Sequence, residues 1–115
     1  MKTVIAGSRT VTNYDILLEA VAESGISITS VVCGLARGAD ALGKRYAKEH
    51  DIPCYEVPAD WARYGRGAGF IRNVEMAEEC EAGIVLWDGE SRGARHMLTQ
   101  LIKFKRPYYL KEVKL

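Results

Sequence analysis

The stretch Ser30-Val31-Val32-Cys33-Gly34-Leu35-Ala36-Arg37-Gly38-Ala39-Asp40 decides the fold class of this chain. A short apolar run ends in a glycine-rich turn, and the turn opens a segment from Ala39 to His50 whose apolar residues have helical spacing. A glycine-rich turn between a strand and a helix can hold an anion at the helix N-terminus. The turn is neither a Walker A loop, since no Gly-Lys-Ser/Thr follows, nor a strict GxGxxG.

The same alternation of apolar runs and helical patterns continues along the whole chain. Strands are predicted at Thr3–Ala6, Ser30–Cys33, Cys54–Val57, Ile84–Trp87 and Pro107–Leu110. Helices are predicted from Thr12 or Asn13 to Gly25, over Ala39–His50 and Ala68–Glu79, and around Ala94–Ile102. Residues 58–67 are predicted as a loop that carries aromatic side chains. Five strands alternating with four helices imply one α/β domain over residues 1–115, with a parallel sheet covered on both faces.

Composition narrows the class of partner. The chain has 115 residues and a formal net charge of +1, which disfavours nucleic acid as the main partner. No apolar run is long enough for a signal peptide or a membrane span, so we expect a cytoplasmic protein with no membrane partner. Cys33, Cys54 and Cys80 fit buried free thiols better than disulfides. No His/Cys cluster predicts a metal, and no cofactor is expected.

The first two strand-to-helix turns carry candidate ligand-binding residues. Gly7, Ser8 and Arg9 combine close backbone approach, a hydroxyl and a forked cation, although a tight turn with a surface arginine explains them equally well. In the second turn, Gly34, Arg37 and Gly38 are candidates for phosphate binding. Asp40 fits a role at the helix N-terminus somewhat better than binding of a ribose hydroxyl.

A third turn and the distribution of arginine support the same interpretation. Ser91, Arg92 and Gly93 form another strand-to-helix turn at the expected edge of the sheet. No lysine occurs between Lys48 and Lys103, yet that stretch carries five arginines, a bias that suits phosphate or carboxylate binding. The alternative is ion pairing with the nearby glutamates at positions 75, 78, 79 and 81. Trp61 and Tyr64, in the predicted loop, are expected at the ligand pocket or a dimeric rim, where a ring could stack on a base. The alternative is that they only pack against the domain.

Taken in order, the motifs resemble a known family. They are Gly7-Ser8-Arg9, Gly34 to Asp40, Ala59-Asp60-Trp61, Tyr64-Gly65, Ala68-Gly69, Arg72-Asn73, Met76, Ser91-Arg92-Gly93 and His96-Met97. Each motif is weak alone, and the ordered series from about Thr3 to Leu110 is similar to the YspA, cpYpsA-related branch of the SLOG superfamily. The resemblance implies a three-layer Rossmann-like sheet in the order 3-2-1-4-5 and a pocket for a nucleotide-derived ligand. It also implies a homodimer or higher homo-oligomer, and a phage or mobile-element source.

Two departures bear on the chemistry that the resemblance implies. The usual Gly-Thr of the last motif is Gly93-Ala94 here, so a phosphate-binding hydroxyl is absent. In the related LOG phosphoribohydrolases a catalytic glutamate follows this motif, and Met97 stands at its position. Their binding arginine aligns with Arg72, which is followed by Asn73. Glu75, one helical turn after Arg72, is the one acid that could compensate as a catalytic residue.

These residues support three functions in order of preference. The first is a binding module that senses or sequesters a nucleotide or nucleotide-derived phosphorylated ligand. The second is an enzyme that cleaves the N-glycosidic bond of a nucleotide, which requires an acid near the sugar. The third is a DNA-binding module like DprA, which the near-neutral charge and the short chain disfavour.

Overall fold

A five-stranded parallel sheet forms the centre of the protein in the computed structural model, which describes residues 1–114. Its strands are β1 (Lys2–Gly7), β2 (Ser30–Cys33), β3 (Cys54–Glu56), β4 (Ala82–Trp87) and β5 (Tyr108–Glu112). The order across the sheet is β3-β2-β1-β4-β5, and every neighbouring pair is parallel. This confirms the predicted fold class and strand order.

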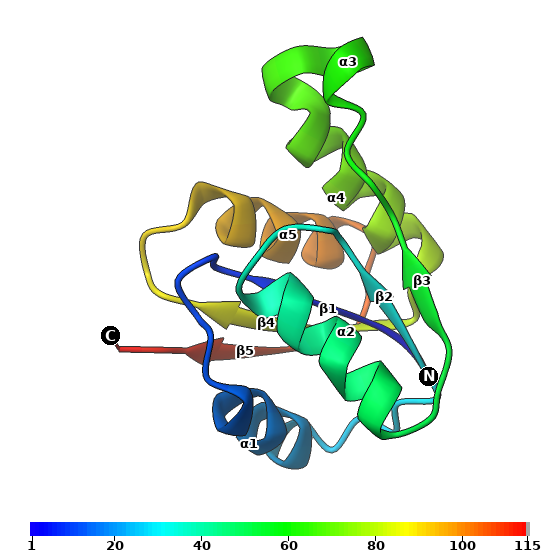
Figure 1. Cartoon of the computed structure of the whole chain (residues 1–115), viewed down its shortest axis with the longest axis vertical. Helices are drawn as coiled ribbons and strands as arrows, with labels where there is room; N and C mark the ends of the chain where they lie inside the picture. Colours follow the sequence, from blue (N-terminus) through cyan, green and yellow to red (C-terminus); the bar gives the residue numbers. More distant parts are fainter. Residues whose placement is uncertain (115) are drawn as a thin grey trace.

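Four long helices cover the two faces of the sheet and complete three layers (Figure 1). They are α1 (Tyr14–Ser24), α2 (Ala39–Glu49), α4 (Ala68–Glu79) and α5 (Arg92–Lys103). Helices α1 and α2 pack on one face, and α4 and α5 pack on the other. Each helix connects two parallel strands across one face of the sheet. Because all strands run in the same direction, the turns that follow them meet at one edge.

The core consists of one apolar cluster on each face of the sheet. Alternate residues of a strand point to opposite faces, so Val4 belongs to the cluster under α4 and α5 while Ile5 belongs to the cluster under α1 and α2. Leu86 and Val85 divide in the same way. All four side chains are fully buried. Burial on both faces explains why these strands are continuous apolar runs without polar alternation.

The helix boundaries follow local capping chemistry. The Asn13 side chain accepts a hydrogen bond from the Asp15 N–H at the start of α1, and Gly25 ends that helix with a φ of 67°. The Ser91 Oγ accepts from the Ala94 N–H at the start of α5, at 3.2 Å. Asn13 and Gly25 lie where the sequence predicts the ends of the first helix, whereas the cap at Ser91 was not predicted.

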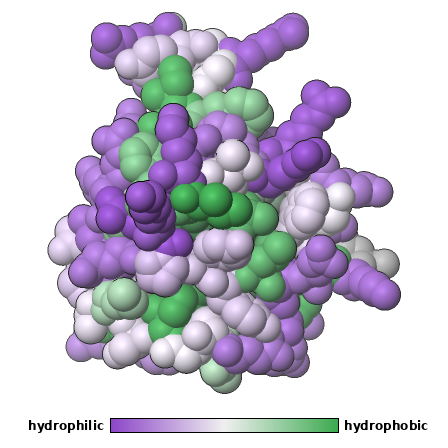
Figure 2. All heavy atoms as spheres, turned by 180° about the vertical axis from the view of Figure 1, so that it is seen from behind, coloured by the Kyte–Doolittle hydropathy of each residue, from purple (hydrophilic) through white to green (hydrophobic). Residues whose placement is uncertain are grey.

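Residues 58–67 differ from the predicted loop because they contain two short helical turns. These are α3 (Trp61–Tyr64) and the 3₁₀ turn η1 (Gly65–Gly67). The Asp60 side chain caps α3 by accepting from the Arg63 N–H, and neither turn has a buried residue. We call residues 58–67 the projecting segment, because α3 stands clear of the sheet beyond the start of α4 (Figure 1). From behind, this end of the molecule is mostly hydrophilic, with some hydrophobic atoms among the polar side chains (Figure 2).

Smaller corrections concern strand ends and burial. Strand β4 begins at Ala82 and β5 continues to Glu112, since pairing with a neighbouring strand extends each beyond its apolar run. Cys54, expected to be buried, is partly exposed because β3 is an edge strand, whereas Cys33 and Cys80 are buried. None of the helices within residues 1–114 is long and apolar enough to cross a bilayer.

Candidate functional site

Two adjacent cavities lie where the predicted turns meet, with volumes of about 410 and 610 Å³. The smaller is lined by turns after β1, β2 and β4 and by α3, α4 and α5. The two cavities share the residues Arg9, Ala36, Trp61 and Arg72, and together we call them the cleft. From β1 the chain adds β2 and β3 on one side of the sheet, and it then adds β4 and β5 on the other side, next to β1. Ligands of parallel α/β sheets bind at such a reversal of strand order.

The turns after β1 and β2 are locked to each other beneath the cleft. The Ser8 carbonyl accepts a hydrogen bond from the Ala39 N–H at 3.2 Å, so one of the free amides at the start of α2 is already occupied. Gly38 has a φ of +76°, and a Cβ there would lie 2.5 Å from the Arg9 Cα. These contacts fix the backbone of both turns before any ligand binds.

Asp88 organises the turn after β4. Its carboxylate accepts hydrogen bonds from the Thr10 Oγ1 at 2.7 Å and from the N–H groups of Glu90 and Ser91, both at 2.8 Å. The Thr10 hydroxyl, followed by the two amides, lowers the pKa of Asp88 to about 2. The Asp88 N–H in turn donates to the buried Ser8 Oγ at 3.0 Å. Asp88 is therefore ionised at neutral pH, and its charge holds together the first and third turns.

Asp40 and Arg72 flank Gly34 inside the cleft. A Cβ on Gly34 would lie 2.6 Å from an Asp40 carboxylate oxygen and 2.8 Å from Arg72 Nη1, so only glycine leaves room for both groups. Asp40 is 5% exposed, and burial raises the pKa of its carboxyl although the Arg72 charge and the Ala36 N–H oppose that rise. The Arg72 Nε is buried without a hydrogen-bond partner. The pair is thus a buried acid and a cation with unused hydrogen-bonding capacity.

The start of α5 faces the smaller cavity through Ser91 and Gly93. The first amides of a helix have no partner within it, and they favour binding of an anion at that end of the helix. The Ser91 hydroxyl occupies only the Ala94 amide. Asn73 of α4 donates to the Gly93 carbonyl at 3.2 Å and holds this end of α5 in place.

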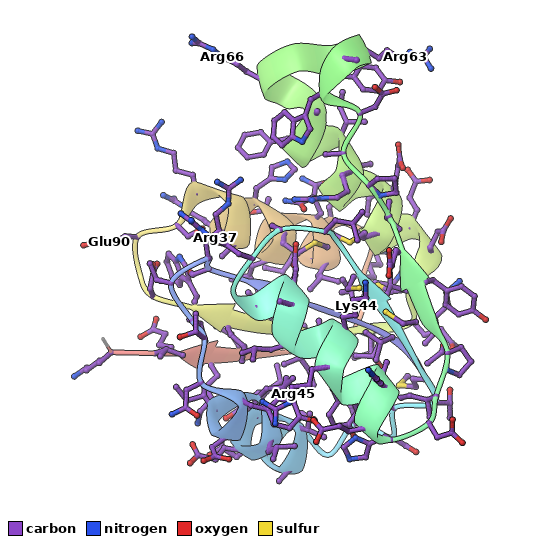
Figure 3. The ribbon with its side chains drawn as sticks, in the orientation of Figure 1. Arg37, Lys44, Arg45, Arg63, Arg66 and Glu90 are labelled. Carbon is purple, nitrogen blue, oxygen red and sulfur yellow. The ribbon has the colours of Figure 1, made fainter. Side chains whose placement is uncertain are left out.

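The arginines around the cleft form no ion pair within residues 1–114, although Arg72 lies near Asp40. The ion pairs found in that part of the chain involve Lys2, Lys44, Arg45 and Lys111 and lie away from the cleft. The alternative that the central arginines pair with the nearby glutamates is therefore wrong for residues 1–114. Arg9, Arg66 and Arg72 line the smaller cavity, and Arg37 lines the larger one. Arg66 borders the cavity while its guanidinium, like that of Arg63, extends outward from the projecting segment (Figure 3).

Most of the predicted site residues lie around or beneath the cleft. Those that line it are Gly7, Arg9, Arg37, Asp40, Trp61, Arg72, Asn73, Ser91 and Gly93. Ser8, Gly34 and Gly38 are buried in the turns and line neither cavity. Arg92 is exposed and borders neither cavity. Direct contact between any of these predicted site residues and a ligand stays a prediction.

The structure does not bring Glu75 to the cleft. Its side chain is exposed on α4, while Asn73 and Met76 of the same helix point inward. The carboxylates that do line the smaller cavity are Asp40 and Asp88. No group of three or more His, Cys, Asp or Glu side chains within residues 1–114 is arranged to hold a metal ion.

Sequence reasoning did not single out several lining residues as site candidates. These are Thr10, Ala36, Gly69, Phe70 and Met97 in the smaller cavity. Phe70 follows the glycine-containing start of α4 and remains 46% exposed, which is unusual for the first aromatic residue of a packed helix. That exposure was not readable from the sequence, because an apolar residue in a helical pattern is normally assigned to the core.

Comparisons with known proteins agree with this architecture. A model of the YspA, cpYpsA-related SLOG family matches residues 1–64, which include the first two strand-end turns. The chain is 33% identical over 115 residues to the Gene 61 protein of Mycobacterium phage D29, covering 89% of each protein. DNA processing protein A (DprA) from Streptococcus pneumoniae has a similar fold, with a TM-score of 0.72 over 93% of this chain at 17% identity. The chain spans about half of DprA (48%). This chain belongs to the YspA, cpYpsA-related SLOG family.

Proposed function

We propose that this protein binds a nucleotide or nucleotide-derived phosphorylated ligand in the cleft and acts as a sensor or sequestering module. The observation that carries the proposal is the set of arginines at the cleft that form no ion pair within residues 1–114. An unpaired cation beside a cavity is a ready site for phosphate, and a guanidinium can bind phosphate through two parallel hydrogen bonds.

In this proposal the phosphate binds near Arg9, Arg72 and the first turn of α5. These groups approach the smaller cavity from three different chain segments, and each supplies hydrogen-bond donors. Asp40 lies beside them and would repel a phosphate, but a carboxylate suits the hydroxyls of a ribose. The site thus offers separate positions for the charged and the sugar part of a nucleotide.

Native mass spectrometry of the purified protein first shows whether a ligand is co-purified. Calorimetric titration with the four ribonucleoside 5′-monophosphates then tests the proposal. Arg72→Ala removes a charged donor from the cleft, so affinity should fall by about ten- to hundredfold. Arg45→Ala is the matched control, because Arg45 pairs with Glu49 on α2 and lines neither cavity. Absence of any bound nucleotide, or equal losses in the two variants, would contradict the proposal.

The second candidate function is hydrolysis of the N-glycosidic bond, and Asp40 is the observation that favours it. Water would add to the sugar C1′ while the departing base receives a proton from an acid near the bond. The raised pKa of Asp40 and its place in the cavity suit an acid, whereas Glu75 lies outside and Asp88 is ionised. Incubation with a nucleotide, followed by chromatography of the free base, distinguishes the two functions. Recovery of the intact nucleotide supports binding alone. Release of the base that is abolished by Asp40→Asn but not by Glu75→Gln supports an enzyme.

A further inference from the structure

One wall of the smaller cavity is aromatic, although the side chains that form it are not part of the core. Trp61 is 53% exposed and Phe70 is 46% exposed, and both line the cavity. Exposed apolar side chains scattered singly need no explanation, but a group of them on a cavity wall indicates a binding surface.

These rings lie on neighbouring elements that pack against one another. A Cβ on Gly69 would lie 3.6 Å from the Trp61 Cη2, so the indole of α3 lies close to the residue that precedes Phe70 in α4. Phe70 stacks on His96 of α5, with ring centroids 4.2 Å apart and planes inclined by 13°. Glycine at position 69 leaves space for the indole next to Phe70.

The ring behind Phe70 is held in place by a hydrogen bond. The Asn73 Nδ2 donates to His96 Nδ1 at 3.2 Å, and the other ring nitrogen, Nε2, lies against the Gln100 side chain. Burial lowers the pKa of His96, so the imidazole stays neutral at physiological pH. A neutral, fixed ring gives Phe70 a rigid support, and a rigid wall loses little entropy when a ligand binds.

Much of the rest of the same cavity is polar. Arg9 and Thr10 line it from the turn after β1, Asp88 from the turn after β4, and Asp40 from the start of α2. A cavity of about 410 Å³ with one aromatic and one charged side fits a ligand that has a flat apolar part and a charged part. Inorganic phosphate or a bare sugar phosphate would use only the polar side.

We infer that Trp61 and Phe70 form a subsite for the planar base of the ligand, with Phe70 positioned by His96. The inference rests on the proposed nucleotide binding and adds that the base, and not only the phosphate, is recognised. Stacking tolerates every base because each has a π-face, so this subsite supplies affinity for nucleobases as a class. His96 acts through Phe70 and is a positioning residue.

The test compares ribose 5-phosphate with the four ribonucleoside 5′-monophosphates by calorimetry, since these ligands differ in the base. The best nucleotide should bind about tenfold or more tightly than ribose 5-phosphate, and Trp61→Leu or Phe70→Leu should reduce that ratio by about tenfold. Tyr64→Leu is the control, because Tyr64 is an exposed aromatic residue of the same helix α3 that lines neither cavity. It should leave the ratio unchanged.

The possible results separate this inference from the proposed function. Equal binding of nucleotide and ribose 5-phosphate, or an unchanged ratio in both leucine variants, overturns the aromatic subsite while nucleotide binding stands. Failure of every probe to bind overturns both. Tryptophan fluorescence is an independent measurement: saturating nucleotide should quench it in the wild type but not in Trp61→Phe, because Trp87, the other tryptophan, lines neither cavity.

Discussion

The strand-end turns and the projecting segment both contain glycines and both contribute an arginine to the cleft, but they differ in packing. In the turns after β1 and β2, a Cβ at Gly7 or Gly38 would come within 2.5 Å of neighbouring backbone atoms. In the projecting segment, Gly65 and Gly67 have no heavy atom within 4 Å of such a Cβ. Glycine therefore allows close packing in the strand-end turns, whereas in the projecting segment no neighbouring atom limits the space around it.

The difference indicates a division of work within the cleft. The strand-end turns are bonded to each other and to Asp88, so their donors are held in position without a ligand. The projecting segment contributes Trp61 and Arg66 from elements with no buried residue. Regions with few buried contacts open at low free energy, so Trp61 can adjust to a ligand while Phe70 and the polar residues of the strand-end turns stay fixed.

The largest expected effect is on the free energy of unfolding. It should follow from adding a methyl group to a glycine at a strand end, but not from adding one in the projecting segment. In Gly7→Ala the Cβ would meet the Leu86 carbonyl oxygen at 2.0 Å, at a φ of +153°. Overpacking and backbone strain together should lower the free energy of unfolding by about 2–5 kcal/mol. Gly67→Ala is the matched control, with a φ of −80° and open space, and should change it by no more than about 0.5 kcal/mol. Urea unfolding of the two variants measures the contrast, and similar losses would remove the distinction.

The loss of stability at low pH should also arise in the strand-end turns. The folded pKa of Asp88 is about 2, below the ordinary aspartate value of 3.8, so its stabilising effect is present above pH 4 and is lost as the pH falls toward 2. In Asp88→Asn this part of the pH dependence should vanish, and the variant should be less stable than the wild type at pH 6 but not at pH 2.

Thr10→Val separates the hydrogen bonds of Asp88 from its charge. The variant keeps the carboxylate and loses the donor that contributes most to the low pKa. The pKa of Asp88 should rise toward its ordinary value, and the acid-dependent loss of stability should become smaller. The free energy of unfolding, measured from pH 2 to pH 7, checks both variants. If Asp88→Asn had the same pH dependence as the wild type, the Asp88 carboxylate would not stabilise the strand-end turns.

The sequence predicted the sheet well because burial on both faces leaves a strong local pattern. Val4, Ile5, Val31 and Val32 form apolar runs that end in glycine or a polar turn, and each run became a strand. The order of the strands came from the family resemblance, since periodicity carries no information on which strands are neighbours. Helix α3 was missed because four residues without a buried side chain have no apolar period.

The candidate site was predicted less completely, for a physical reason. Turn residues such as Arg9 and Gly93 could be grouped, because parallel strands bring their ends to one edge. Phe70 and His96 meet only through the packing of α4 on α5, which no sequence pattern encodes. Glu75 was selected by its spacing from Arg72, but at that spacing its side chain lies on the exposed face of α4.

The smallest expected effect is a difference in the order of proteolysis between Arg37 and the arginines of the projecting segment. Trypsin cleaves after arginine only where the chain can open locally, and exposed segments without a core open most readily. Arg63 and Arg66 lie in α3 and η1, where no side chain is buried. Arg37 is also exposed, but Gly38 next to it packs on Arg9, and the Ala36 N–H donates to Asp40 at 3.2 Å.

Brief digestion followed by mass spectrometry should therefore give the first cuts after Arg63 and Arg66, before any cut after Arg37. In a double variant, Arg63→Gln with Arg66→Gln, these early fragments should disappear while the cut after Arg37 stays slow. If Trp61 closes on a bound base, saturating nucleotide should slow cleavage in the projecting segment and leave Arg37 unaffected, because the strand-end turns are already fixed. A first cut after Arg37 in the wild type would mean that those turns open more easily than the projecting segment, which contradicts the division of work inferred from their packing.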